Sequence, residues 1–553
     1  MNNPPSRNWF SALLFVLIGM GFGVGISLYT LGQRYAKLSR EGVTVRHEVR
    51  GRTGWEKIDL VLDIVRDKYV DTLDCDAVID AALDAALASL DPHSVYMPPV
   101  DLEEADSQLA GDFEGIGIQF NVPADTATVI EVISGGPSER AGLLPGDRLL
   151  EVDGRSIAGR NFPQDSMVAL MRGPSGTKVT ILIDRQGTRF PVEIQRGKIP
   201  LHSVDASFML DDGRTGYIRL AKFSVNAYHD FVDAFKPLQQ AGMEKLILDL
   251  RDNSGGYMDQ AIYIAQELLP RGEMIVYTEG RKSPREEVHS EGRGRLQDVE
   301  LVILLNEFSA SASEILAGAV QDNDRGLIVG RRSFGKGLVQ EPVYFSDGSG
   351  IRLTVARYYT PSGRCIQKPF TSDYDYEAYG RYNMGGEVYS ADNMHIDSTE
   401  VFHTRGGRTV YGSGGIVPDI FVPVDTTRAT SFYIACNRKS TQMRYAAWVL
   451  DKQSQRLSAI DSYPAMDAFL EELDIPASFT GFAFSRDGIV AAKGEWEASA
   501  SYLLPQLRAL VARYSKLGEN AFYRYYLEID DVLKQAIEAP ALKLEDTSPA
   551  TGQ

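Results

Sequence analysis

Three serines separated by single alanines stand where an apolar run gives way to a helical one. The segment Ser309-Ala310-Ser311-Ala312-Ser313-Glu314 follows the apolar run Leu301–Leu305 and precedes the apolar stretch Ile315–Val320. A serine at a strand-to-helix turn has an exposed hydroxyl beside free backbone amides, which could stabilise an oxyanion. The spacing Ser311-x-x-Glu314 is also that of a capping box, in which the two side chains only cap the helix. From this segment alone, both interpretations stay open.

A lysine in a glycine turn is the second candidate for chemistry. The spacing Gly330-x-x-x-x-Gly335-Lys336 nearly completes a phosphate-binding P-loop, which would make the protein a nucleotidase. Gly337 stands where the P-loop carries the Ser or Thr that binds magnesium, and Leu338–Pro342 has the pattern of a strand instead of the required helix. The P-loop interpretation therefore fails, and on local grounds Lys336 is a solvated turn lysine.

Other hydrolase patterns are weak in this chain. The sequence contains no Gly-x-Ser-x-Gly elbow and no His-Glu-x-x-His pair for zinc, so no metal site is predicted. The seven histidines are scattered, and His93, in Asp91-Pro92-His93-Ser94, is assigned to a turn. Ser254, in Asn253-Ser254-Gly255-Gly256, is a rival nucleophile, but its neighbours are turn formers and favour a structural role.

The elements that would position these residues belong to a multidomain chain. At about 150 residues per domain, 553 residues correspond to three or four domains. A net charge of -18 argues against a nucleic-acid partner, because phosphate contacts need a basic face. Three cysteines make no disulfide framework and no CxxC pair.

An uncharged stretch of 23 residues, 9–31, is long enough to cross a bilayer as a helix. We expect an uncleaved anchor within residues 1–34, because the stretch is long for a signal peptide and lacks a clear cleavage site. The expected placement is a single pass through a bacterial inner membrane with the catalytic part extracytoplasmic. Arg7 alone precedes the span and five basic residues follow it by position 50, so a bare positive-inside count points the other way.

The rest of the chain divides into four parts by pattern. Residues 55–110 have helical spacing, and Asp91-Pro92 ends that pattern. Residues 111–196 carry short β-rich runs between Gly and Pro turns, at 128–133, 179–183 and 190–194. Residues 197–425 alternate strands and helices, with buried strands expected at 245–250 and 301–305. Residues 426–553 return to helical patterns. The fold class predicted is mixed, multidomain α/β.

The second part resembles a PDZ domain, a β-barrel-like reader of peptide tails. Its glycine loop Gly115-Ile116-Gly117-Ile118, its Ala141-Gly142-Leu143 turn and its Pro145-Gly146-Asp147 hairpin occur in the PDZ order. Consecutive amides in such a loop can converge on a terminal carboxylate, while an exposed strand edge accepts the peptide. The resemblance implies that the backbone of Ile116, Gly117 and Ile118 holds that carboxylate.

Five ordered motifs resemble the carboxyl-terminal processing peptidases, or tail-specific proteases, of the S41 serine-peptidase family, over roughly residues 55–425. The motifs are Leu248–Gly256, Ser309–Glu314, Phe334–Gln340, Thr354–Gly363 and Gly415–Asp419. In that family the nucleophile is the middle serine, with a lysine 25 residues later, and Ser311 and Lys336 fit this pattern. The anchor and the last 120 or so residues lie outside the resemblance.

The resemblance implies roles for further residues. Gln340 matches the glutamine that orients the lysine, and Asp249, Arg251 and Glu314 match supporting positions. The oxyanion hole is expected from the amide of Ala312 and from one amide of the Gly255-Gly256 turn. Ser254 departs from the family, which often has Pro there, and this leaves open which turn amide points inward.

A serine endopeptidase that needs no cofactor is therefore expected, with Lys336 as the base and proteins with accessible, apolar C-termini as substrates. A free lysine titrates near 10.4, so a base at pH 7 needs its pKa lowered by about three units, or roughly 4 kcal/mol. Desolvation is the available cause, and Lys336 should be buried with few carboxylates near its amine. The main alternative is a membrane-tethered PDZ scaffold with an inactive core. A homo-oligomer formed through the C-terminal helices is allowed, although their sequence gives no specific sign of it.

Overall fold

The computed structural model of the protein describes residues 54, 56–122, 125–133, 135–370, 381, 386–412, 414–427 and 430–542. By its internal contacts the chain divides into two compact units, Met1–Ala82 and Leu83–Gln553. The described part of the first unit is helical, with α2 (Glu56–Lys68) and the start of α3 (Cys75–Ala88). Within the described ranges no helix is both long and apolar enough to cross a bilayer. The predicted anchor at 9–31 lies outside these ranges.

The second unit begins with the end of α3, a short strand and a helix. These are β1 (Val95–Met97) and α4 (Pro99–Ala110). Pro99 stands at the first turn of α4, where a missing N–H costs nothing, and Gly111 ends the helix in the left-handed conformation at φ 71°. Only helices were predicted over 55–110. The strand β1 exists because it pairs with a strand some 250 residues later in the chain, which local periodicity cannot reveal.

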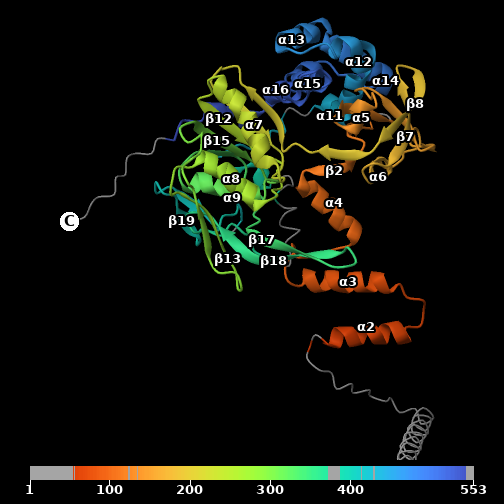
Figure 1. Ribbon diagram of the computed structural model, residues 1–553. Coiled ribbons are helices and arrows are strands. Elements are labelled where there is room, and N and C mark those ends of the chain that lie inside the picture. The colour runs from red at the N-terminus through yellow and green to blue at the C-terminus, as the bar shows by residue number, and fades with distance from the viewer. Residues whose placement is uncertain are drawn as a thin grey trace, which may run out of the picture. The chain divides into compact units, whose positions relative to one another are not determined.

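Residues 112–200 form a small β domain with two short helices (Figure 1). Five antiparallel strands run in the order β3–β4–β5–β7–β8, with β6 on β5 and with β2 and β9 as a separate pair. Three strands lie where β-rich runs predicted them, and Val129, Leu149 and Ile181 are fully buried between them. The elements are β2 (Asp112–Gly115), β3 (Ile118–Asn121), β4 (Ala127–Val132), α5 (Pro137–Arg140), β5 (Arg148–Val152), β6 (Arg155–Ser156), α6 (Gln164–Met171), β7 (Lys178–Arg185), β8 (Thr188–Gln195) and β9 (Gly197–Pro200).

A six-stranded sheet forms the centre of the next part. Its order is β10–β11–β12–β15–β16–β21, parallel except for β10 at one edge. The two strands predicted as buried are β12 (Lys245–Asp249), in which every residue is buried, and β15 (Glu300–Leu305), in which all but the first are. The other strands are β10 (Val204–Met209), β11 (Thr215–Leu220), β16 (Leu327–Gly330) and β21 (Ile420–Phe421).

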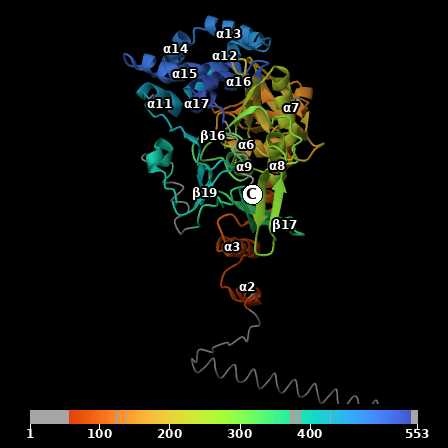
Figure 2. The same ribbon diagram turned by 90° about the vertical axis from the view of Figure 1, so that its left-hand side faces the viewer.

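Helices cover both faces of this sheet. On one face lie the helices α7 (Ala227–Gln240), α8 (Met258–Leu268) and α9 (Ala312–Asp322), which are labelled in Figure 2. Alternate residues of the strands, such as Leu248 and Ile303, pack with these helices. The residues between them, such as Ile247 and Leu304, pack with η3 (Leu527–Ile529) and α17 (Asp531–Glu538) near the end of the chain. The second face of the central sheet is therefore closed by residues more than 200 positions away in sequence.

A second sheet lies beside the first and is antiparallel throughout. Strand β18 (Gly350–Tyr359) is its centre and pairs with β17 (Leu338–Tyr344), with β1 and with β13 (Met274–Glu279), which pairs in turn with β14 (Glu286–His289). The loop between β16 and β17 carries Lys336. A long excursion follows, with η1 (Glu387–Tyr389), η2 (Ala391–Asn393), β19 (Val401–His403) and β20 (Thr409–Tyr411).

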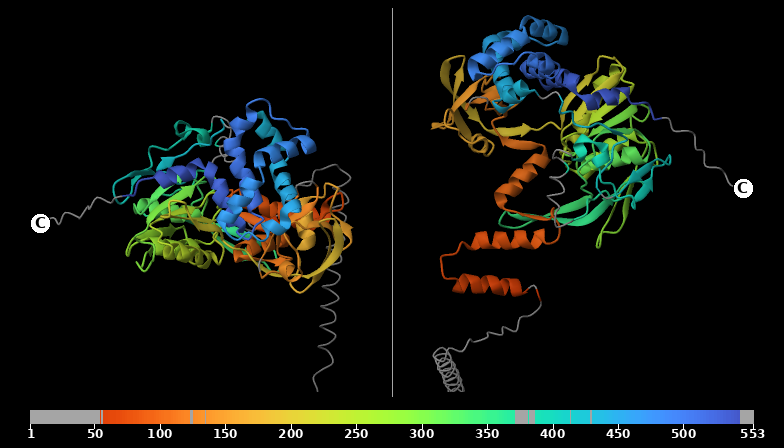
Figure 3. Two further views of the ribbon diagram at one scale, coloured as in Figure 1. Left: turned by 90° about the horizontal axis from the view of Figure 1, so that it is seen from above. Right: turned by 180° about the vertical axis from the view of Figure 1, so that it is seen from behind.

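The C-terminal helices gather around an aromatic core of their own (Figure 3). They also contact the β domain, since Leu450 packs against the Gly146 turn, Arg148 pairs with Asp451, and Gln186 Nε2 donates to Ser454 Oγ at 2.6 Å. The helices are α11 (Ser431–Arg438), α12 (Thr441–Leu457), α13 (Tyr463–Glu472), α14 (Ile475–Asp487), α15 (Glu495–Ala512) and α16 (Gly518–Tyr526).

Candidate active site

Ser311 stands between the carboxyl end of β15 and the first residue of α9. Its φ of 56° and ψ of -113° place it in the left-handed half of conformational space, which costs a non-glycine residue about 1–3 kcal/mol. The neighbouring serines serve the turn itself. Ser309 Oγ donates to Leu250 O at 2.8 Å and Ser313 Oγ donates to Asn253 O at 2.9 Å, and both side chains are fully buried. Of the three serines, Ser311 is the one that lines the neighbouring cavity.

That cavity, called here the Ser311 cavity, has a volume of about 420 Å³. Met258 and Ile315 give it an apolar part, and Lys222 and Arg352 contribute cations. The last turns of α4 form one wall through Ala105, Asp106 and Leu109. Lys336, Gln340 and the turn Ser254–Gly256 also line it, so the structure brings the predicted Lys336, Gln340, Gly255 and Gly256 together with Ser311.

The amine of Lys336 is half-buried and donates to Gln340 Oε1 at 2.8 Å. Burial, and next the positive charge of Arg352, lower the pKa of this amine, whereas Glu314 and Asp91 act in the opposite direction. Gln340 in turn donates from Nε2 to the backbone carbonyl of His93. The imidazole of His93 does not line the cavity. Burial and the charge of Lys336 lower its pKa to about 4, so it is neutral at pH 7.

Glu314 connects the two segments that carry Ser311 and Lys336. Its fully buried carboxylate accepts the amide of Ser311 at 2.8 Å and the amide of Lys336 at 2.9 Å. It also accepts the amide of Gly335 at 2.8 Å and the hydroxyl of Ser333. Burial raises the pKa of Glu314 to about 7 although these four donors favour the carboxylate. The predicted capping box is present, and it extends beyond the helix end to the lysine loop.

Tyr358 of β18 makes a second connection between the same two segments. Its hydroxyl lies 3.1 Å from Ser311 O and also bonds to Lys336 O, while the ring is buried. Tyr358 lies within the motif Thr354–Gly363, which by itself predicts no role for this residue. Nothing in a strand pattern tells which hydroxyl meets a carbonyl 47 residues away.

The glycine turn approaches Ser311 so closely that no side chain fits. A Cβ at Gly255 would lie 2.8 Å from Ser311 Cβ and 3.0 Å from the amide of Ala312. The amide of Gly255 donates to Asn253 Oδ1 at 2.9 Å and is therefore already used. Gly256, at φ 145°, would place a Cβ 2.1 Å from Phe223 O. Both glycines are required here by close approach as well as by backbone conformation.

The predicted supporting residues Asp249 and Arg251 lie in a separate buried cluster and do not line the Ser311 cavity. Burial alone would raise the pKa of Asp249, but the charge and hydrogen bonds of Arg251 lower it to about 2. Arg251 also pairs at 2.6 Å with Asp530, the residue that caps α17. These two residues hold the turn that leads to Asn253 and attach it to the C-terminal helices.

The predicted tail-binding loop, Gly115–Ile118, uses its carbonyl groups internally. Ile116 O accepts the amide of Ser138 at 2.9 Å, and Gly117 O accepts the amide of Ile133 at 3.1 Å. Because the C=O and N–H of a trans peptide point in opposite directions, the amides of Gly117 and Ile118 point away from these partners. This orientation is the one that a carboxylate-binding loop requires.

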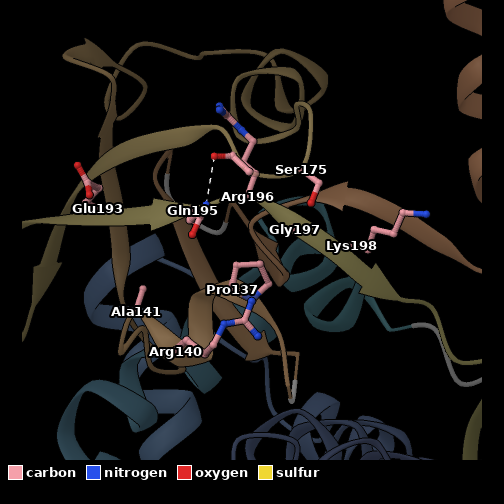
Figure 4. A pocket seen from close by; sticks show the side chains of 10 residues that line it. Pro137, Arg140, Ala141, Ser175, Glu193, Gln195, Arg196, Gly197 and Lys198 are labelled. Carbon is pink, nitrogen blue, oxygen red and sulfur yellow. Dashed lines mark hydrogen bonds between the residues drawn. The ribbon is translucent and has the colours of Figure 1, made fainter.

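A cavity of about 520 Å³ lies elsewhere on the β domain, between α5 and the strands β8 and β9 (Figure 4). Pro137 and Arg140 stand side by side at its wall, and Arg196 and Lys198 add charge. Arg196 is committed to four neighbours, among them Met171 O at 3.1 Å and Leu170 O at 2.9 Å. The loop 115–118 does not line this cavity.

A serine at a strand-to-helix turn beside a cavity, on a mainly parallel α/β sheet joined to a small β domain, is an arrangement typical of a serine-type hydrolase. Residues 214–376 match peptidase family S41, and residues 128–185 match the PDZ domain. The chain belongs to the C-terminal processing peptidases of family S41, which are serine-type endopeptidases.

Two relatives and one solved structure illustrate the similarity. A carboxy-terminal-processing protease of Bartonella bacilliformis is 36% identical over 332 residues, which are 59% of this chain and 76% of the relative. A carboxyl-terminal-processing protease of Synechocystis is 40% identical over 296 residues, which are 52% of this chain and 68% of the relative. The solved structure, a photosystem II D1 C-terminal processing protease, is 26% identical over 67% of this chain and 87% of its own, with a TM-score of 0.36.

Proposed function

We propose that the protein cleaves polypeptides with a Ser311–Lys336 dyad oriented by Gln340, after its PDZ domain has captured the substrate by the C-terminal tail. The observation that supports the dyad is that two buried side chains each bond to both the segment of Ser311 and the segment of Lys336. One buried carboxylate, Glu314, accepts both backbone amides, and one buried hydroxyl, Tyr358, contacts both carbonyls. Such ties hold a nucleophile and a base in one geometry, which is worth several kcal/mol in rate.

The chemistry follows from the protonation states. Burial lowers the pKa of Lys336, so a larger fraction of its amine is neutral near pH 7. That amine removes the proton of Ser311 Oγ as the oxygen attacks the peptide carbonyl, and it then gives the proton to the departing amine. Water attacks the resulting ester and loses a proton to Lys336. Lys336 returns this proton to Ser311 Oγ as that oxygen departs, which releases a carboxylic acid and free Ser311. The enzyme ends unchanged, and one peptide bond has been hydrolysed.

We assign the oxyanion donors to the amides of Ala312 and Gly256. Ala312 opens α9, where backbone amides have no partner within the helix. Gly255 and Gly256 both line the Ser311 cavity, but the Gly255 amide already donates to Asn253. Two donors aimed at one oxygen are the usual arrangement for acyl transfer, and each is worth about 3 kcal/mol in the transition state.

We further propose that the loop 115–118 receives the terminal carboxylate of the substrate. The outward amides of Gly117 and Ile118 support this proposal.

We also propose that residues 9–31 anchor the protein in a bacterial inner membrane, with the catalytic part extracytoplasmic. The 23-residue uncharged stretch supports this proposal. Membrane fractionation and accessibility to an added protease in intact and permeabilised cells would test the placement.

The dyad is tested by comparing two serines that line the same cavity. We expect Ser311→Ala and Lys336→Ala to lower kcat on a peptide with an apolar C-terminus by at least about a thousandfold. Ser254→Ala should retain activity, because Ser254 is an exposed turn residue of that cavity. Circular dichroism and thermal melting would show that all three variants are folded. Full activity in Ser311→Ala would refute the assignment, and so would acylation by an active-site reagent that is lost in Ser254→Ala and kept in Ser311→Ala.

A further inference from the structure

The turn Asp91–Ser94 contacts Gln340, the residue whose side chain bonds to the proposed base Lys336. The backbone carbonyl of His93 accepts a hydrogen bond from Gln340 Nε2. At the other end of the same amide, Gln340 Oε1 accepts from Lys336 Nζ at 2.8 Å. One glutamine side chain thus spans from a backbone carbonyl near position 90 to the amine at position 336, and sequence patterns assigned His93 only to a turn.

The position of the His93 carbonyl is fixed by several bonds. The carboxylate of Asp91 accepts the amides of His93 and Ser94, both at 2.8 Å, and the hydroxyl of Ser94 at 2.7 Å. Thr354 of β18 donates to Asp91 from Oγ1 at 3.3 Å and to Ser94 Oγ from its amide at 3.2 Å. Asp91 and Ser94 are both buried. The turn is therefore bonded within itself and to the strand beside Gln340.

The carbonyl gives the glutamine amide a direction. A primary amide has a donor end and an acceptor end, and only the donor end can bond to a carbonyl. With Nε2 on His93 O, the acceptor Oε1 must face Lys336. A neutral amine that donates one N–H to Oε1 has its lone pair held in a defined direction. If the amide were free to flip, its NH₂ group would face the amine and this orientation would be lost.

We propose that the Asp91–Ser94 turn is a positioning element for the peptidase reaction, acting through the His93 carbonyl on Gln340 and through Gln340 on Lys336. The inference rests on the proposed function of Lys336 as base. The group of His93 that bonds to Gln340 is its backbone carbonyl. Its ring packs against Phe334 and Phe370, with centroids 6.4 and 6.2 Å apart.

A double-mutant cycle on the full chain tests the route of action. Asp91→Ala should lower kcat by about ten- to a hundredfold with KM nearly unchanged, because small displacements of a reacting group cost rate. In a Gln340→Ala background, the same change should lower kcat by less than about twofold, because the link through Gln340 is already gone. A turn that acts only through general stability would give the same factor in both backgrounds, and that result would overturn the proposal.

Two further variants control for charge and for stability. Asp91→Asn keeps an oxygen for the His93 and Ser94 amides and should retain most of the kcat that Asp91→Ala loses. Asp347→Ala is the control, because Asp347 likewise accepts the amide and the hydroxyl of a nearby serine, Ser349, at 2.9 and 2.7 Å, in the turn between β17 and β18. It should leave kcat within about twofold. If Asp91→Ala fails to fold, Ser94→Ala replaces it in the cycle.

The pH profile adds a readout that a purely structural role would not move. Arg352, Glu314, Asp91 and His93 are the titratable or charged groups around the Lys336 amine. Removing the charge of Asp91 removes a group that raises the pKa of Lys336. Asp91→Asn should therefore shift the acid limb of kcat to lower pH with its plateau kept, whereas Asp91→Ala should lower the plateau as well. Equal plateaus in these two variants would contradict the proposal.

Two different outcomes show whether the positioning role of the turn is wrong or the proposed function itself is wrong. If Gln340→Ala retains full kcat while Ser311→Ala is inactive, the dyad stands and the turn has no positioning role. If Ser311→Ala itself remains active, the proposed function is wrong.

Discussion

At the scale of the single residue, the carboxylate of Glu314 accepts more hydrogen bonds than a helix cap requires. A capping box predicts one bond from its carboxylate to the Ser311 amide, and three further donors come from the lysine loop. The spacing Ser-x-x-Glu therefore predicted the cap and could not predict the loop. Contacts between residues 19 to 22 positions apart across an irregular segment leave no periodic trace in a sequence.

The buried carboxyl of Glu314 should make stability depend on pH. Burial raises its folded pKa to about 7 from an ordinary value of 4.5, so the folded state holds this proton more tightly than the unfolded state does. Its contribution to the free energy of unfolding therefore falls as pH rises between these two values, by up to about 3 kcal/mol. Glu314→Gln cannot titrate, so the stability difference between wild type and variant should shrink from pH 5 to pH 8. Urea unfolding of both proteins at the two pH values measures it, and an equal difference at both would contradict the assignment.

The conformation of Ser311 is a second feature of this scale that the sequence does not contain. A positive φ is favoured by glycine, and nothing in Ser-Ala-Ser-Ala-Ser indicates which serine adopts it. The spacing of 25 residues between Ser311 and Lys336 identifies Ser311 as the nucleophile only through the resemblance to family S41. The structure adds a physical reason, since Ser309 and Ser313 are committed to carbonyls of the adjoining turn.

At the scale of elements, β12 and β15 were predictable because strands buried on both faces are continuously apolar. The strand β1 was not predicted, since three residues pair with β18 only after the chain has folded. The long excursion between β18 and β21 makes a contact that the sequence does not predict. Arg381, within it, donates to the carbonyls of Ser333 at 3.0 Å and Arg332 at 3.2 Å, and so supports the loop that carries Lys336.

Strand β18 should matter for catalysis through one hydroxyl. We expect Tyr358→Phe to lower kcat by about tenfold and stability by about 1–2 kcal/mol, because the carbonyls of Ser311 and Lys336 lose a shared partner inside the protein. Tyr359→Phe is the matched control in the next position of the strand. Its ring stacks on Tyr277 at 4.7 Å, and the change should leave kcat nearly unaltered. Equal effects of the two substitutions would remove the special role of Tyr358.

At the scale of the whole molecule, the C-terminal helices belong to the peptidase fold. Sequence resemblance ended near residue 425, and the helical pattern beyond it gave no sign of where those helices pack. The structure places Leu533 and Ala536 of α17 against Ile247 and Leu304 of the central sheet. One face of the sheet that carries Ser311 is therefore covered in part by residues outside the recognisable family region.

A charge placed on the buried face of α17 should unfold the peptidase part. We expect Leu533→Asp to destabilise the protein by about 3–5 kcal/mol, because it removes a buried side chain and buries an unpaired carboxylate. Gln535→Asp introduces the same charge on the exposed side of the same helix and should change stability by less than about 0.5 kcal/mol. Melting temperature and resistance to limited proteolysis measure both. Similar melting temperatures for the two variants would show that α17 is dispensable.

The late position of α17 in the chain also sets the order of events during synthesis. A ribosome adding roughly 5–20 residues per second needs on the order of 10–45 s to pass from Leu304 to Leu533. Throughout that interval the apolar face formed by Ile247, Val302 and Leu304 has no partner, so the sheet beneath Ser311 stays incomplete. We therefore expect a nascent chain of this protease to stay inactive until α17 has left the ribosome, which would spare neighbouring proteins from premature cleavage.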